Sequence, residues 1–169
     1  MRTKRGAGAV AALSVGLLLA GCAVPDAGDR QVTEGRDRYW DAKAGAADTA
    51  AFMKVTVPEG ATGVVGAVQV NPREDVYVLS FVTGERDAEG IAESLRSEGP
   101  LEARKNDAAP EAELFGYLGL AEPQTLSGTR WAGVCPPCVG DDRRGRVQWI
   151  EVYVQSLGGG RARVYLEAF

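Results

Sequence analysis

The chain has 169 residues, of which 45% are hydrophobic and 25% are charged, a composition typical of one globular domain with short appendages. Its net charge of −4 argues against nonspecific nucleic-acid binding, which needs a basic surface. The chain contains no histidine, which removes the commonest general base and the commonest neutral metal ligand. We therefore expect no nucleic-acid partner and no histidine-based chemistry.

The N-terminus has the pattern of a secretory signal peptide over residues 1–21. Arg2, Lys4 and Arg5 give it a positively charged start, and an apolar run of small and aliphatic residues follows over 6–20. This run is short for a membrane-spanning helix, which needs about 20 apolar residues. An uncleaved anchor helix is therefore the less favoured interpretation.

The apolar run ends in Leu19-Ala20-Gly21-Cys22. All four positions match the lipobox of bacterial lipoproteins, a family that this segment resembles. In that family a diacylglyceryl group is attached to the cysteine thiol, and a signal peptidase cleaves just before the cysteine. The resemblance implies cleavage between Gly21 and Cys22 and attachment of acyl chains such as palmitate through Cys22. We expect a protein anchored in the cell membrane, on its extracytoplasmic face.

Cleavage at Cys22 would change the charge of the protein. It would remove three of the 19 basic residues and none of the 23 acidic ones, so the net charge would become −7. Residues 22–50 are mostly polar and small, and we predict a lipidated, flexible tether there. Tyr39 and Trp40 are its only large apolar pair, and we expect them to fasten the tether to the domain over 51–169.

The first half of this domain shows strand patterns and one strong helix pattern. We predict strands over 52–57, 64–70 and 75–83, with the last two forming a hairpin. A helix should follow between Asp87 as its cap and Gly99, with the buried residues at helical spacing. These residues are Ala88, Ile91, Ala92 and Leu95.

The second half ends in another predicted hairpin. A short helix is possible over 110–118, and strands are expected over 146–155 and 161–169 around a glycine-rich turn. Together these patterns predict an α+β fold, with an antiparallel sheet of four to five strands, two hairpins and one main helix.

Cys135-Pro136-Pro137-Cys138 is the other notable motif. With Cys22 lipidated, Cys135 and Cys138 are the two remaining cysteines, and outside the cytoplasm such a pair tends to oxidise. We predict a structural disulfide. A thioredoxin-like redox centre is an alternative, but the following residues do not have a helix pattern. Zinc is a weaker alternative, because a structural site needs four ligands.

The remaining polar and aromatic candidates point to no reaction. Trp131 is a weak candidate for ligand binding, although packing on the sheet edge or the disulfide explains it more simply. The charged run Asp141–Arg144 is expected to face solvent. No serine has a catalytic context and no carboxylate spacing indicates an acid–base pair, so we expect no catalytic residues, no metal and no cofactor.

These observations predict a noncatalytic lipoprotein that binds a partner protein or an envelope ligand, with the lipid bilayer as its other partner. The alternatives are an extracytoplasmic thiol–disulfide protein that uses Cys135 and Cys138, and an accessory component of a transporter or sensor. In composition the chain resembles the small lipoproteins of high-GC actinobacteria, a likeness that implies no activity.

Overall fold

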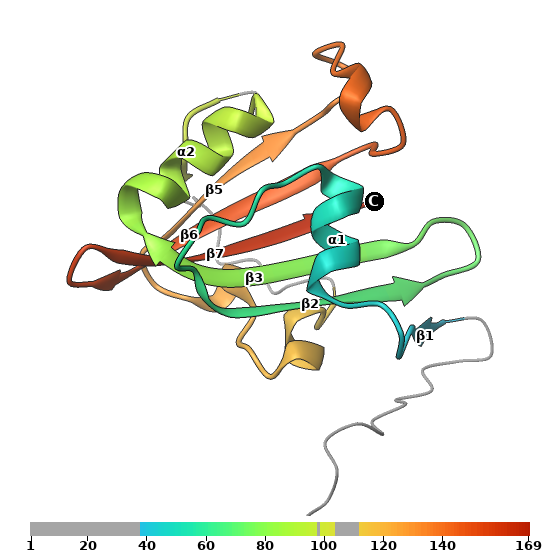
Figure 1. The fold of residues 1–169 in the computed structure, drawn as a ribbon, viewed down its shortest axis with the longest axis horizontal. Helices are drawn as coiled ribbons and strands as arrows, with labels where there is room; N and C mark the ends of the chain where they lie inside the picture. The colour runs from blue at the N-terminus through green and yellow to red at the C-terminus, as the bar shows by residue number, and fades with distance from the viewer. Residues whose placement is uncertain (1–37, 98, 104–111) are drawn as a thin grey trace, which may run out of the picture.

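A computed structural model describes residues 38–97, 99–103 and 112–169 of the chain. The lipobox, the signal peptide and residues 23–37 lie outside this part, as do the first two residues of the helix predicted over 110–118. The described residues form one antiparallel sheet with two α-helices, so the predicted α+β class is confirmed (Figure 1).

The sheet has seven strands where four to five were predicted. Their order across the sheet is β1-β2-β3-β7-β6-β5-β4, and every neighbouring pair is antiparallel. The strands are β1 (Tyr39–Trp40), β2 (Thr62–Val70), β3 (Val76–Gly84), β4 (Glu102–Ala103), β5 (Thr129–Val134), β6 (Ile150–Gly158) and β7 (Arg161–Ala168).

Both predicted hairpins are present, as β2–β3 and β6–β7. They join through β3 and β7, whose pairing runs without interruption from Tyr77–Ala168 to Gly84–Arg161. β6 begins at Ile150, four residues later than predicted. The β6–β7 turn uses three successive glycines with positive φ, Gly158 to Gly160, a conformation that other residues rarely adopt.

The N-terminal boundary of the fold lies earlier than residue 51. β1 pairs with the end of β2, and α1 (Ala46–Met53) packs on β2 and β3, so residues 39–50 belong to the fold. The strand expected over 52–57 is wrong, because Phe52 and Met53 end α1. The alanine-rich segment favours a helix, since alanine has the highest helix propensity.

The predicted main helix is α2 (Glu85–Leu95), and its four expected core residues are all buried. Its ends differ from the prediction. Gly84 is the N-cap, while Asp87 lies in the first turn and accepts a 3.4 Å hydrogen bond from the Thr83 hydroxyl. The helix ends before Gly99, because Arg96 adopts a left-handed conformation with φ of 60°.

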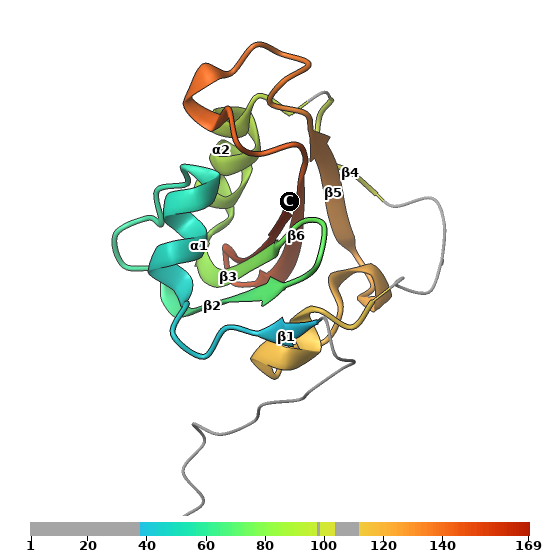
Figure 2. The ribbon, with the colours of Figure 1, turned by 90° about the vertical axis from the view of Figure 1, so that its right-hand side faces the viewer.

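The sheet separates two apolar clusters. One face, which we call the helix-covered face, packs against α1 and α2 through residues such as Leu79, Val152 and Val164. On the other face, which we call the opposite face, the segment 112–128 packs instead (Figure 2). This segment contains the short 3₁₀ helices η1 (Phe115–Leu118) and η2 (Pro123–Thr125). In the described part of the helix predicted over 110–118, η1 is the helix that forms. The opposite-face cluster consists of Trp40, Ala67, Val78, Leu114, Phe115, Tyr153 and Tyr165.

Candidate functional site

The two cysteines of the Cys135–Cys138 motif form a disulfide directly after β5, as predicted. Their Cα atoms are 5.2 Å apart. Cys135 is buried, with 8% of its surface exposed, whereas Cys138 is exposed. A reagent in solution therefore has better access to the sulfur of Cys138 than to that of Cys135.

The backbone around the disulfide forms a tight turn. The Val139 N–H donates to the Cys135 carbonyl at 3.2 Å, and the Asp141 N–H donates to the Pro136 carbonyl at 2.9 Å. The Cys138 N–H donates to Cys135 Sγ at 3.2 Å. The next element is the three-residue 3₁₀ helix η3 (Asp142–Arg144), so the long helix that follows the first cysteine in thioredoxin-like centres is not present here.

The charged run after the disulfide is partly buried, which corrects the expectation that it faces solvent. Asp141 and Arg144 form an ion pair whose side chains are only 2% and 3% exposed. Arg144 also donates from Nε to the carbonyl of Met53 at 2.7 Å and from Nη2 to that of Lys54 at 3.2 Å. These carbonyls lie at the C-terminal end of α1, so Arg144 joins the disulfide loop to that helix.

Asp141 is held as an anion by its neighbours. Its hydrogen bonds from Arg143, and next from Arg144, lower the pKa of the Asp141 carboxyl well below its ordinary value, although burial acts the other way. The same pairing raises the pKa of Arg143. Both arginines of the run are therefore engaged by one carboxylate, which leaves them less able to stabilise a thiolate at Cys135.

Trp131 belongs to β5 and packs against the opposite-face cluster, where it is partly buried. It pairs in register with Tyr153 of β6 and with Glu102 of β4. Trp131 thus lies one strand in from the edge of the sheet and packs on the apolar cluster, rather than at the sheet edge itself. Four residues of extended strand separate it from Cys135, which is roughly 13 Å, so it does not cover the disulfide.

Polar groups gather on the opposite face beside the aromatic residues. The Tyr153 hydroxyl donates to Glu151 and accepts a 3.1 Å hydrogen bond from the amide of Gln124. Glu122 is buried and accepts the Gly116 N–H at 2.8 Å. Burial raises the pKa of the Glu122 carboxyl, with hydrogen bonds from the backbone acting against it. This group could not be predicted from the sequence, because Glu122 and Gln124 come from the start of η2 whereas Glu151 and Tyr153 come from β6.

A second polar group lies on the same face at the β6–β7 hairpin end. The Tyr165 hydroxyl donates to the side-chain oxygen of Gln155 at 3.3 Å, and burial raises the pKa of that hydroxyl. Gln155 pairs in register with Thr129 on one side and Arg163 on the other. Arg161 lies two residues before Arg163 on β7.

Within residues 38–97, 99–103 and 112–169, no group of three or more cysteine or acidic side chains is arranged to hold a metal ion. In the same part of the chain, no helix is both long and apolar enough to cross a membrane. Gly21 and Cys22, the predicted cleavage and lipid sites, lie outside it.

No protein-family model, curated protein or solved structure matches this chain. Evidence about its function therefore comes from its own residues and their geometry.

Proposed function

We propose that the mature protein is a noncatalytic binding module, held on the extracytoplasmic face of the cell membrane by lipid on Cys22. The observation that carries the proposal is the assignment of all three cysteines. Cys135 and Cys138 pair with each other, which leaves Cys22, at the end of the lipobox, available for acylation. A structural disulfide also agrees with an oxidising compartment outside the cytoplasm.

Several features support a binding role over catalysis. The chain has no histidine. Asp141, a carboxylate whose pKa is lowered, fastens the disulfide loop to α1 through its ion pair with Arg144. In this proposal residues 23–37 connect the lipid to the fold. The net charge of −7 would keep the domain away from an anionic membrane surface.

Labelling of cells with radioactive palmitate tests the anchor. We expect label on the wild-type protein and none on Cys22→Ser, because the thiol is the acceptor of the diacylglyceryl group. The double variant Cys135→Ser/Cys138→Ser is the matched control and should keep the label. Intact mass should show that the labelled protein begins at Cys22. Equal labelling of Cys22→Ser and wild type would overturn the anchor.

A second candidate is thiol–disulfide exchange, which the unequal exposure of the two cysteine residues favours. A partner thiolate would attack the sulfur of Cys138, the exposed residue, and form a mixed disulfide, while the bond between Cys135 and Cys138 breaks. The electron pair would remain on Cys135 Sγ, where the Cys138 N–H already donates at 3.2 Å. A second thiol of the partner would then release Cys138 as a thiolate and leave the partner oxidised.

Equilibration of the mature protein with redox buffers distinguishes the two candidates. A reduction potential below about −300 mV is typical of structural disulfides, and a potential between about −120 and −270 mV is typical of catalytic pairs. With the potential in the structural range we would reject exchange activity. With the potential in the catalytic range, Cys135→Ser should trap a mixed disulfide through Cys138.

A further inference from the structure

The β6–β7 hairpin end of the opposite face carries two arginines. Ala162 and Val164 are buried in the cluster of the helix-covered face, so the alternate residues Arg161 and Arg163 point to the opposite face, as Tyr165 does. Arg163 is partly buried and Arg161 is exposed. Two positive charges on one face of a strand repel each other, so this arrangement requires a compensating partner or costs stability.

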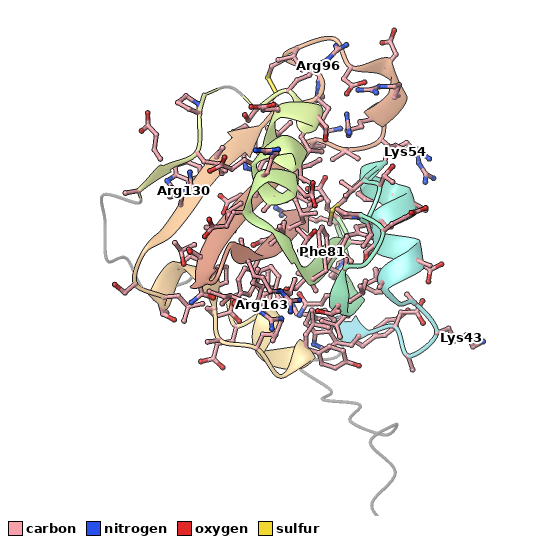
Figure 3. The ribbon with its side chains drawn as sticks, turned by 60° about the vertical axis from the view of Figure 1, so that its left-hand side comes forward. Lys43, Lys54, Phe81, Arg96, Arg130 and Arg163 are labelled. Atoms are coloured by element: carbon pink, nitrogen blue, oxygen red, sulfur yellow. A yellow bond between two sulfur atoms is a disulfide. The ribbon has the colours of Figure 1, made fainter. Side chains whose placement is uncertain are left out.

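Neither arginine has a carboxylate partner within the described part of the chain. Among the described residues Arg163 has neither an ion pair nor a hydrogen bond from its guanidinium, and Arg161 donates only to the Thr62 hydroxyl, at 2.8 Å. By contrast, Arg130 pairs with Glu89 at 2.8 Å and lies well apart from Arg163 (Figure 3). Arg163 therefore retains unused hydrogen-bond donors for a ligand.

Gln155 adds a neutral donor beside Arg163. The two residues are directly paired across β6 and β7, a geometry that places their Cβ atoms about 5 Å apart. The Tyr165 hydroxyl donates to Oε1 of Gln155 at 3.3 Å, which fixes the amide and leaves its Nε2 group as a donor. Burial keeps the Tyr165 hydroxyl protonated over the physiological range, because the pKa of that group is raised.

Thr129 gives an independent sign that a group is missing here. It is in register with Gln155 on the other side, so the three residues Thr129, Gln155 and Arg163 form one row across the sheet. Thr129 is 8% exposed, and its buried hydroxyl oxygen has no hydrogen-bond partner among the residues that the structure describes. Buried hydroxyls in native proteins are nearly always paired with protein, water or ligand.

Glu122, the N-cap residue of η2, is an acidic group that acts on the neighbouring Tyr165. It and Arg163 influence the pKa of Tyr165 in opposite directions, but no ion pair joins them among the described residues. Glu122 instead accepts the Gly116 N–H. The guanidinium of Arg163 thus stays available, although the mature protein has a net negative charge.

We propose that Arg163 and Gln155, which are paired across β6 and β7, form a binding site for an oxyanion, the phosphate or carboxylate group of an envelope ligand, with the exposed Arg161 adding positive charge nearby. Guanidinium groups match the geometry of these oxyanions and can bind them through two parallel hydrogen bonds. The proposal rests on the proposed function, since it names the ligand chemistry of the binding module. Binding should weaken with salt, because it depends on charge.

Titration of the full mature lipoprotein in neutral detergent with inorganic phosphate tests the site. We expect saturable shifts of the Arg163 Nε–H and Gln155 amide NMR signals, with a Kd of about 1 mM or tighter. Arg163→Gln should weaken binding by about tenfold, and the exposed Arg161→Gln should weaken it less. Arg130→Gln is the matched control and should bind like wild type, because Arg130 is already paired with Glu89.

A second arm identifies the source of the oxyanion. The same signals are followed with dihexanoyl phosphatidylglycerol and dihexanoyl phosphatidylcholine below their micelle concentrations. Shifts with the phosphatidylglycerol probe and none with the phosphatidylcholine probe, lost in Arg163→Gln, would assign the site to an anionic lipid headgroup. Shifts with inorganic phosphate and with neither lipid probe would assign it to a free phosphate group. No shift with any probe, or equal binding by Arg163→Gln, overturns the site and leaves the palmitate test of the anchor unaffected.

Discussion

Arg144 donates from its Nε atom to the carbonyl oxygen of Met53, across 91 residues of sequence, at 2.7 Å. Met53 is the last residue of α1 and is fully buried, so its carbonyl would otherwise lack the partner that a helix end requires. The same guanidinium is neutralised by Asp141, three residues before it. One arginine thus fastens the disulfide loop to the first helix and satisfies that helix end.

Replacement of Arg144 by alanine should therefore destabilise the fold. An unsatisfied buried carbonyl costs about 1–3 kcal/mol, which corresponds to a fall in Tm of about 2–4 °C per kcal/mol at this size. Thermal unfolding followed by circular dichroism measures the loss. Arg143→Ala is the matched control, because the side chain of Arg143 is 61% exposed and does not reach α1. A loss in Arg143→Ala as large as that in Arg144→Ala would contradict this account.

Gly66 sets how closely α1 approaches the sheet. A Cβ atom at this position would lie 2.6 Å from the Thr49 hydroxyl oxygen and 2.7 Å from Ala46 Cα. The second contact is with backbone, so α1 would have to move, and Gly66→Ala should cost about 1–3 kcal/mol. Urea denaturation measures this cost.

Gly90 provides the opposite control for Gly66. It lies on the exposed side of α2, where an added Cβ would meet nothing within 4 Å. Gly90→Ala should therefore stabilise the protein by about 0.5–1 kcal/mol, because alanine favours the helix. The close approach of α1 to β2 would be in doubt if the two glycine substitutions changed stability in the same direction.

The parts of the fold that could be predicted are those in which apolar residues recur at the regular spacing of a helix or a strand. α2 repeats its buried residues at helical spacing, and the strands of both hairpins alternate, so the sequence identified each of them. The elements that were not predicted lack such a regular spacing of apolar residues. α1 buries only Thr49 and Met53 among small alanines, and the resulting pattern resembles a polar linker.

β5 was missed for a related reason. Its sequence contains Gly133, and glycine is uncommon in the interior of a strand. The structure explains this glycine: a Cβ there would lie 2.8 Å from Cη2 of Trp149, whose ring crosses the strand. Such a contact joins residues distant in sequence, and one chain gives no sign of it. The hydrogen bonds of Arg144 to the carbonyls of Met53 and Lys54 could not be predicted for the same reason.

The disulfide should contribute little to global stability. The loop closed by Cys135 and Cys138 is very short, so the entropy lost from the unfolded chain corresponds to at most about 2 kcal/mol. Cys135→Ala/Cys138→Ala should therefore still unfold cooperatively in urea, with a loss within that limit. A larger loss of stability would mean that the disulfide turn holds Asp141 and Arg144 in place. Arg144→Ala would then destabilise the disulfide-free variant less than it destabilises the wild-type protein.

Glu122 should make stability depend on pH. Burial raises its pKa above the ordinary value of 4.5. The folded state therefore favours the protonated carboxyl, and this contribution is complete below the ordinary pKa and is lost as the pH rises through the raised one. Glu122→Gln stays neutral and keeps an oxygen for the Gly116 N–H. The Tm of Glu122→Gln relative to wild type should thus increase from about pH 4 to pH 7.

Asp141 does not affect the comparison of Tm between Glu122→Gln and wild type. Its lowered pKa makes both proteins lose stability as the pH falls through the acidic range, so the effect cancels in the difference between them. Glu113→Gln is the matched control, because Glu113 is exposed and acts on Glu122 only through its charge, which raises the pKa of Glu122. Its Tm difference from wild type should change less with pH. A Tm difference for Glu122→Gln that stays constant between pH 4 and pH 7 would contradict this account. It would mean that burial does not raise the pKa of Glu122.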